Sequence, residues 1–131
     1  MLTGLYLFLL LMTLGSYGQP IPFYGRILEG APAKIFIVLD ALVGLHLVIG
    51  LFKRQRLTWY LLLGYNLFEA SNTVVSLLLV PHAELERAQG AAVDPHALLV
   101  TNLIVLAAIA WVSLTIYRRR ELFNNRSPYL F

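Results

Sequence analysis

TWYLLLGYNLFEASNTVVSLLLV, residues 58–80, is the most informative segment of the chain. It is mostly apolar, and Pro81 follows it, where the proline ring and the missing N–H end a helix. A helix needs about 20 mostly apolar residues to cross the hydrocarbon core of a bilayer, and this stretch is long enough. The sequence therefore predicts a transmembrane helix over residues 58–80.

One face of this predicted helix is polar. Successive residues on a helix turn by about 100°, so side chains three or four residues apart share a face. The polar stripe consists of Asn66, Glu69, Asn72, Thr73 and Ser76, with Tyr65 at its edge. A charge at the centre of a membrane helix costs roughly 2.5 to 3.5 kcal/mol on insertion scales. We therefore expect this face to contact other helices, a ligand or water, and not lipid.

Three further apolar runs lie on either side of this stretch. They cover residues 1–17, 33–52 and 97–117. Two outer connections, residues 18–32 and 82–96, are predicted to be loops. A short basic connection and a basic tail, residues 118–131, complete the chain. The first run also has the apolar length of a signal peptide. Because no Lys or Arg precedes it and no A-x-A-like site follows it, we interpret it as a span.

The composition agrees with this pattern. Hydrophobic residues make up 59% of the 131 residues and charged residues 13%, whereas a soluble domain has about 25% charged residues. So few charges can cover the ends of a helical bundle but not a surface in water. We expect an all-α membrane protein, a four-transmembrane-helix bundle in which residues 1–131 form one integral membrane domain.

The basic residues predict the orientation, because Lys and Arg gather on the cytoplasmic side of membrane proteins. One side of the predicted bundle holds Lys53, Arg54, Arg56, Arg118, Arg119, Arg120 and Arg126. The opposite side holds Arg26, Lys34 and Arg87. We therefore expect both termini in the cytoplasm and a multi-pass protein of the cell (inner) membrane. The basic residues from Lys53 to Arg56 and from Arg118 to Arg120 are candidates for contacts with lipid head groups or a partner.

Two other predicted spans carry polar residues at membrane depth. Asp40 and His46 lie in the second span, and Asn102 lies in the fourth. The second and third spans run antiparallel, so residues at the same depth in the membrane are expected to be neighbours. By this comparison Asp40 matches Asn72 and Thr73, and His46 matches Asn66 or Tyr65. Together with the stripe, these residues form a predicted intramembrane polar network.

Two interpretations of this network stay open. In the first, Asp40, His46 and Glu69 form a relay for protons or cations, since carboxyl and imidazole groups exchange protons. In the second, the network is structural, and interhelical hydrogen bonds of about 0.6 kcal/mol each hold the spans together.

The outer connections give weaker signals. Prolines at positions 20, 22 and 32 predict a loop over residues 18–32, with a short turn over residues 23–28 lying on the bilayer surface. The other connection holds imidazole and carboxylate side chains that suit a divalent metal. This possible metal set is His82, Glu84, Glu86, Asp94 and His96. Its spacing matches no specific motif, and the same residues can equally be solvated helix caps.

Missing motifs narrow the function classes. The chain has no cysteine, which removes thiolate metal sites and cysteine nucleophiles, and it has no phosphate-binding glycine loop or serine-hydrolase pattern. Without such motifs, we expect no cofactor and no enzymatic activity. We also expect no nucleic-acid partner, since the basic residues lie at helix ends, where membrane topology explains them. We predict a non-enzymatic accessory or assembly subunit that contacts the lipid bilayer and other membrane subunits or a second copy of itself. The alternative is a small oligomeric transporter or channel that couples protons or cations through the Glu/Asp/His network.

Overall fold

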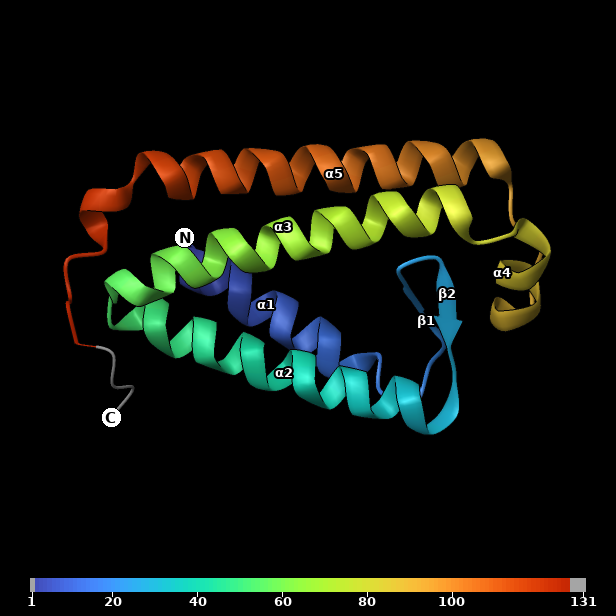
Figure 1. Cartoon of the computed structure of the whole chain (residues 1–131), viewed down its shortest axis with the longest axis horizontal. Helices are drawn as coiled ribbons and strands as arrows, with labels where there is room; N and C mark the ends of the chain where they lie inside the picture. Colours follow the sequence, from blue (N-terminus) through green and yellow to red (C-terminus); the bar gives the residue numbers. More distant parts are fainter. Residues whose placement is uncertain (1, 128–131) are drawn as a thin grey trace.

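The computed structural model describes residues 2–127, and helices make up most of them (Figure 1). In chain order the elements are α1 (Leu2–Gly15), β1 (Ile21–Phe23), β2 (Arg26–Leu28), α2 (Gly30–Phe52), α3 (Arg56–Leu79), α4 (His82–Gln89), α5 (Pro95–Arg118) and the 3-10 turn η1 (Arg120–Leu122). The prediction of a helical chain is confirmed. The one pair of strands in residues 2–127 is the β1–β2 hairpin.

Length and composition decide which of these helices can cross a bilayer. α2 and α5 are each long and apolar enough. α3 meets the same criterion only together with α4, to which it is bent by 109° at a short break, because its polar face lowers its hydropathy. α1 is apolar but has only 14 residues. Two described helices, or three if the bent pair counts as one span, are therefore able to span a membrane.

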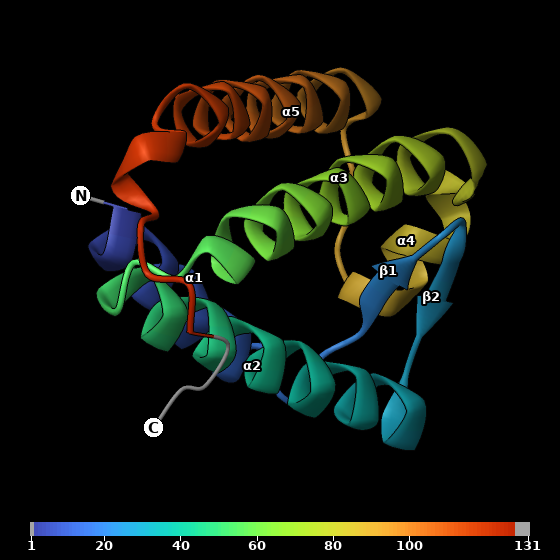
Figure 2. The same cartoon turned by 60° about the vertical axis from the view of Figure 1, so that its left-hand side comes forward.

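The helices pack in pairs and then separate toward one end. α1 packs along α2, and α3 packs along α5. α2 and α3 meet at the short connection between them and diverge toward the other end, where the hairpin lies between them (Figures 1 and 2). We call these the basic end and the hairpin end. The basic end is defined by Lys53, Arg54, Arg56, Arg118, Arg119, Arg120 and Arg126.

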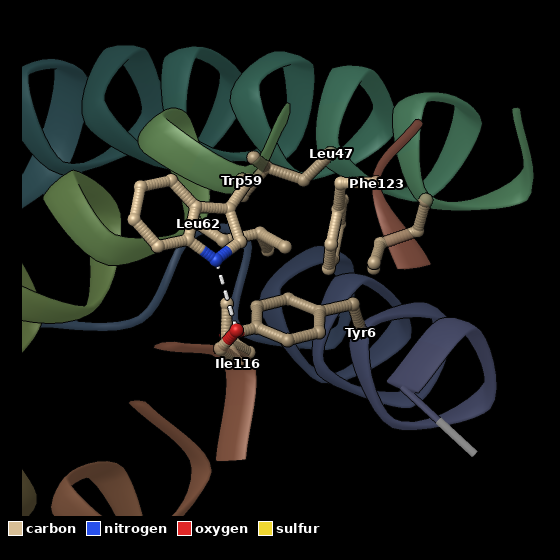
Figure 3. Close-up of a cluster of buried hydrophobic side chains, with 7 residues drawn as sticks. Tyr6, Leu47, Trp59, Leu62, Ile116 and Phe123 are labelled. Carbon is tan, nitrogen blue, oxygen red and sulfur yellow. Dashed lines mark hydrogen bonds between the residues drawn. The ribbon is translucent and has the colours of Figure 1, made fainter. Parts of the chain in front are cut away.

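The core lies near the basic end and is formed by side chains of α1, α2, α3, α5 and the tail; Figure 3 shows most of them. Its buried members are Tyr6, Leu47, Leu51, Trp59, Leu62, Ile116 and Phe123. The indole Nε1 of Trp59 donates to the carbonyl of Ile116 at 2.9 Å and so joins α3 to the last turn of α5. That carbonyl lies among the last carbonyls of α5, which lack partners within the helix. Phe123, from the tail, is buried against the same cluster.

The tail folds back onto the connection between α2 and α3. The backbone of Asn125 donates to the carbonyl of Arg54 at 3.0 Å and accepts from the N–H of Arg56 at 2.8 Å. The side-chain Nδ2 of Asn125 donates to the carbonyl of Lys53 at 3.1 Å. The two basic segments that the sequence places on one side are therefore in contact. Residues 128–131 of the predicted tail lie outside the described residues.

A β-hairpin replaces the loop and surface turn that we expected over residues 18–32. β1 and β2 pair antiparallel, with Ile21 opposite Leu28. Tyr24 and Gly25 between them have φ values of 45° and 86°, as in a type I′ turn that matches the twist of two strands. The expected loop is wrong over residues 21–28, because they form a hairpin that folds inward between α2 and α3 (Figure 2).

A short helix, α4, lies within the second outer connection, which we expected to be a loop. Pro81 precedes α4, and Gly90 ends it with a φ of 71°. The N–H of Gly90 donates to the carbonyl of Glu86 at 2.8 Å, so a left-handed residue satisfies one of the last helix carbonyls.

Prolines also account for the earlier starts of two long helices. α2 begins at Gly30, not at residue 33, and includes Pro32, because the N–H groups of a first helical turn have no helical partner. α5 begins at Pro95, not at residue 97, and Asp94 caps it by accepting from the N–H of His96 at 3.1 Å.

Candidate functional site

The polar face of α3 is the candidate site, and it makes three sets of contacts along its length. Near the basic end, the hydroxyl of Tyr6 donates to Oδ1 of Asn66 at 2.7 Å. Nδ2 of Asn66 donates to Oγ of Ser113 at 3.1 Å. The amide of Asn66 is buried and therefore needs partners, which α1 and α5 provide. This bridge joins three helices at one level.

At the centre of the face, Asp40 of α2 joins α1 and α3. Its Oδ1 accepts from the hydroxyl of Tyr65 at 2.9 Å, and its Oδ2 accepts from Oγ1 of Thr13 at 3.3 Å. The expected pairing of Asp40 with Asn72 or Thr73 is wrong. A depth count compares backbone positions only, whereas the long phenol of Tyr65 reaches along the helix to the carboxylate.

Glu69 lies beside this central group. Its half-buried carboxyl is close enough to interact with Tyr65 and with Asp40. Thr73, one turn further along, donates to the backbone carbonyl of Glu69 at 2.8 Å and so makes its bond within its own helix. The structure thus brings together two carboxyl groups and one phenol from the predicted network.

Near the hairpin end, the face binds the backbone of the hairpin. The N–H of Tyr24 donates to Oδ1 of Asn72 at 2.8 Å, and the N–H of Gly25 lies 3.3 Å from Oγ of Ser76, to which it donates. Nδ2 of Asn72 donates to the carbonyl of Pro22 at 3.4 Å. Three polar groups at the tip of the hairpin therefore find their partners on α3.

Side chains at the tip strengthen this contact. The hydroxyls of Tyr24 and Ser71 are hydrogen-bonded at 2.7 Å. A Cβ atom at Gly25 would lie 2.8 Å from Cβ of Leu79, so only glycine allows the tip to approach α3 this closely. The positive φ of Gly25 makes the same demand.

His46 and Asn102 do not join the network. The Nε2 atom of His46 is buried and has no hydrogen-bond partner among the described residues. The His46 side chain lines a groove of about 560 Å³ between α2 and α3. Leu42, Tyr60 and the predicted neighbour Tyr65 line the same groove. Asn102 donates to the carbonyl of Leu98 in its own helix at 2.8 Å.

The possible metal ligands of the outer connection are not brought together. In residues 2–127 no group of three or more His, Asp or Glu side chains lies close enough to hold a metal ion. Asp94 caps α5, and Oε1 of Glu86 accepts from the N–H of Val93 at 3.0 Å. These two carboxylates therefore order the chain between α4 and α5.

The basic residues differ in what they contact. Arg120 donates to the hydroxyl of Tyr60 at 3.2 Å and lies over the ring of Trp59, 5.0 Å from its centroid. At the hairpin end Arg87 and Glu29 form an exposed ion pair at 3.4 Å. An exposed pair of this kind contributes little to stability.

Tyr6, Thr13 and Ser113 are members of the network that the sequence did not indicate. Each is a hydroxyl residue in a mostly apolar helix that carries other hydroxyl residues as well, so residue type does not distinguish these three. The one signal in the sequence is that they lie at the depths of Asn66 and Asp40, which need partners.

Comparison with known protein families, with curated proteins and with solved structures gives no match for this chain. Amides and hydroxyls that bond across helices hold those helices together. Two carboxyl groups beside one phenol are in addition able to exchange a proton.

Proposed function

We propose that the chain is a four-span membrane protein with both termini in the cytoplasm, and that it acts as a non-enzymatic accessory or assembly subunit. The criterion of length and hydropathy supports α2 and α5 as spans. The seven basic residues of the basic end, where α1 begins and α5 ends, favour the cytoplasm for that end. The two remaining crossings need a structural argument.

The hairpin completes the crossing that α1 begins. With 14 residues, α1 is about 21 Å long, which is shorter than the roughly 30 Å hydrocarbon core. The hairpin continues beyond the end of α1, between the diverging helices α2 and α3 (Figure 1). Irregular backbone is tolerated at membrane depth where protein groups satisfy it, and Asn72 and Ser76 do so here.

The same contacts explain why α3 is less apolar than its neighbours. Its polar side chains bond to α1, α2, α5 and the hairpin. In the proposed arrangement α3 therefore crosses the bilayer with its polar face covered by the chain itself.

One observation carries the functional part of the proposal. The polar groups of Asn66, Asp40 and Asn72 are bonded to other parts of the same chain, so they hold the fold together. A conduction pathway needs such groups to meet ions or water. What the molecule offers to its surroundings is long apolar helix faces and a basic end, which suit lipids and other membrane subunits.

The test is purification of the full chain at native expression level in a mild detergent, followed by quantitative mass spectrometry. An unrelated membrane protein of similar size, with the same tag and level, is the control. We expect one membrane partner in fixed stoichiometry that the control does not retain. Recovery of a lone monomer or homodimer would contradict the subunit proposal.

A proton-coupled transporter is the second candidate, and the position of Glu69 beside Tyr65 and Asp40 favours it. In proteoliposomes, Glu69→Gln removes the exchangeable proton while keeping the side-chain shape, so a proton-linked flux should be abolished. Glu84→Gln, on α4 outside this group, is the matched control. An unchanged flux in Glu69→Gln would exclude Glu69 as the carrier.

A further inference from the structure

A pocket of about 400 Å³ opens at the basic end, between the first turn of α1, the end of α2 and the tail. Leu2, Leu51 and Phe123 form much of its apolar wall, and Leu51 and Phe123 belong to the buried core. Two arginines, Arg54 and Arg119, also line it. Apolar walls and two cations in one cavity suit a ligand that is itself both apolar and anionic.

The two arginines are not neutralised by the chain. The residues that line the pocket include no Asp or Glu. Among residues 2–127, the ion pair of the structure is Arg87 with Glu29, at the opposite end. The guanidinium groups of Arg54 and Arg119 accordingly have no carboxylate partner within the described part of the chain.

The backbone at Arg54 gives a second, independent observation. The N–H of Gln55 bonds to the carbonyl of Gly50 and that of Arg54 to the carbonyl of Leu51, which is the Schellman pattern that ends a helix. Arg54 occupies the left-handed position of this motif with a φ of 53°, where glycine is the usual residue. An arginine here is conformationally unfavourable, and it places a guanidinium in the wall of the pocket.

We propose that this pocket binds one anionic phospholipid, with the phosphate between Arg54 and Arg119 and the start of an acyl chain against Leu51 and Phe123. Guanidinium groups bind phosphate oxygens through paired, charge-assisted hydrogen bonds. The apolar wall favours a lipid over free phosphate, since a small anion would leave that wall uncovered. The lipid belongs to the leaflet at the basic end, so the assignment of that leaflet to the cytoplasm rests on the proposed orientation.

The experiment titrates phosphatidylglycerol, and phosphatidylcholine as a comparison, into the full chain in detergent and follows the rise in melting temperature. Native mass spectrometry gives the number of lipids retained. Ligand that binds the folded state raises its stability according to concentration and affinity. We expect one retained phosphatidylglycerol and a clear preference over phosphatidylcholine.

Three variants separate the pocket from general attraction to negative charge. Arg54→Gly removes the guanidinium and relieves the positive φ, so the fold should be as stable as before or more stable. We expect Arg54→Gly and Arg119→Gln to weaken binding of phosphatidylglycerol by about tenfold or more. Arg118 is an exposed neighbour outside the pocket wall. Arg118→Gln should weaken binding of phosphatidylglycerol by no more than the roughly fivefold expected for one basic residue near an anionic surface.

Two results would overturn the proposal. Equal losses in Arg118→Gln and Arg54→Gly would mean that charge alone attracts the lipid. Inorganic phosphate or glycerol phosphate that competes with the lipid at similar concentration would mean that the pocket is a site for soluble anions. Binding in detergent depends on neither the orientation nor a partner subunit, so failure of those proposals would leave this result in place.

Discussion

The backbone N–H of Tyr24, at the tip of the hairpin, donates to Oδ1 of Asn72 on α3 at 2.8 Å. The same amide donates through Nδ2 to the carbonyl of Pro22 at 3.4 Å. One side chain thus satisfies two backbone groups of an irregular segment. In a bilayer such groups would each cost several kcal/mol if they had no partner. The polar face of α3 is therefore needed to hold the hairpin as well as the helices.

Asn72→Leu should lower stability by about 1 to 3 kcal/mol, because it leaves two backbone groups of the hairpin without partners. Asn102→Leu is the matched control, since the Asn102 amide bonds only within its own helix in the described structure. We expect the control to change stability by less than about 0.5 kcal/mol. Reversible unfolding of the purified protein in mixed micelles measures both. Equal losses in the two variants would show that hairpin docking does not depend on Asn72.

The bridge from Tyr6 through Asn66 to Ser113 should behave as a coupled unit. Tyr6→Phe should cost about 1 kcal/mol, since it removes the donor to a buried amide. In the double variant with Asn66→Leu the losses should be less than additive. A double-mutant cycle from the same unfolding measurement gives the coupling energy. A coupling energy of zero would mean that the two residues do not interact in the folded protein.

Gly50 lets α2 and α3 approach closely near their connection. A Cβ atom at this position would overlap the hydroxyl of Thr58, whose side chain is fully buried. Gly50→Ala should therefore destabilise the protein by about 1 to 3 kcal/mol. Gly64→Ala, where the added atom meets nothing within 4 Å, should be neutral or gain up to about 1 kcal/mol of helix propensity. If both variants were neutral, the close contact between Gly50 and Thr58 would be contradicted.

Cysteine labelling tests the proposed topology directly, because the natural chain has no cysteine. In intact cells, Ala91→Cys between α4 and α5 should react with a membrane-impermeant maleimide. Asn124→Cys in the tail should react only after the membrane is permeabilised. The reverse pattern would place the basic end outside. Labelling of both sites in intact cells would place both on the outer side, so α5 would not cross the membrane and the proposed topology would be contradicted.

The long helices were predictable because their apolar runs are local signals, as are Pro81 after α3 and the basic residues after α2 and α5. The hairpin was not, since Pro22 argues against a strand and Tyr24 is an unusual residue at a positive φ. Gly25 and the alternation of Ile21 and Phe23 were the signals available. They become decisive only once α3 is known to provide the hydrogen-bond partners.

α4 and the central polar group show a second limit. The hydrophilic residues of α4 resemble a loop, although Pro81 and Gly90 mark the start and end of a helix. The stripe on α3 was predictable from helical spacing alone. Its partners were not, because Tyr6 and Thr13 belong to α1, and helical periodicity within one segment does not say which helices pack together.

Amide hydrogen exchange at Tyr24 and Gly25, measured for the protein in nanodiscs, tests most directly whether the polar face of α3 holds the hairpin. We predict slow exchange at both amides in the natural protein, strong acceleration at Tyr24 in Asn72→Leu, and no change in Asn102→Leu. Fast exchange at Tyr24 in the natural protein, equal to that of an exposed loop, would contradict the account.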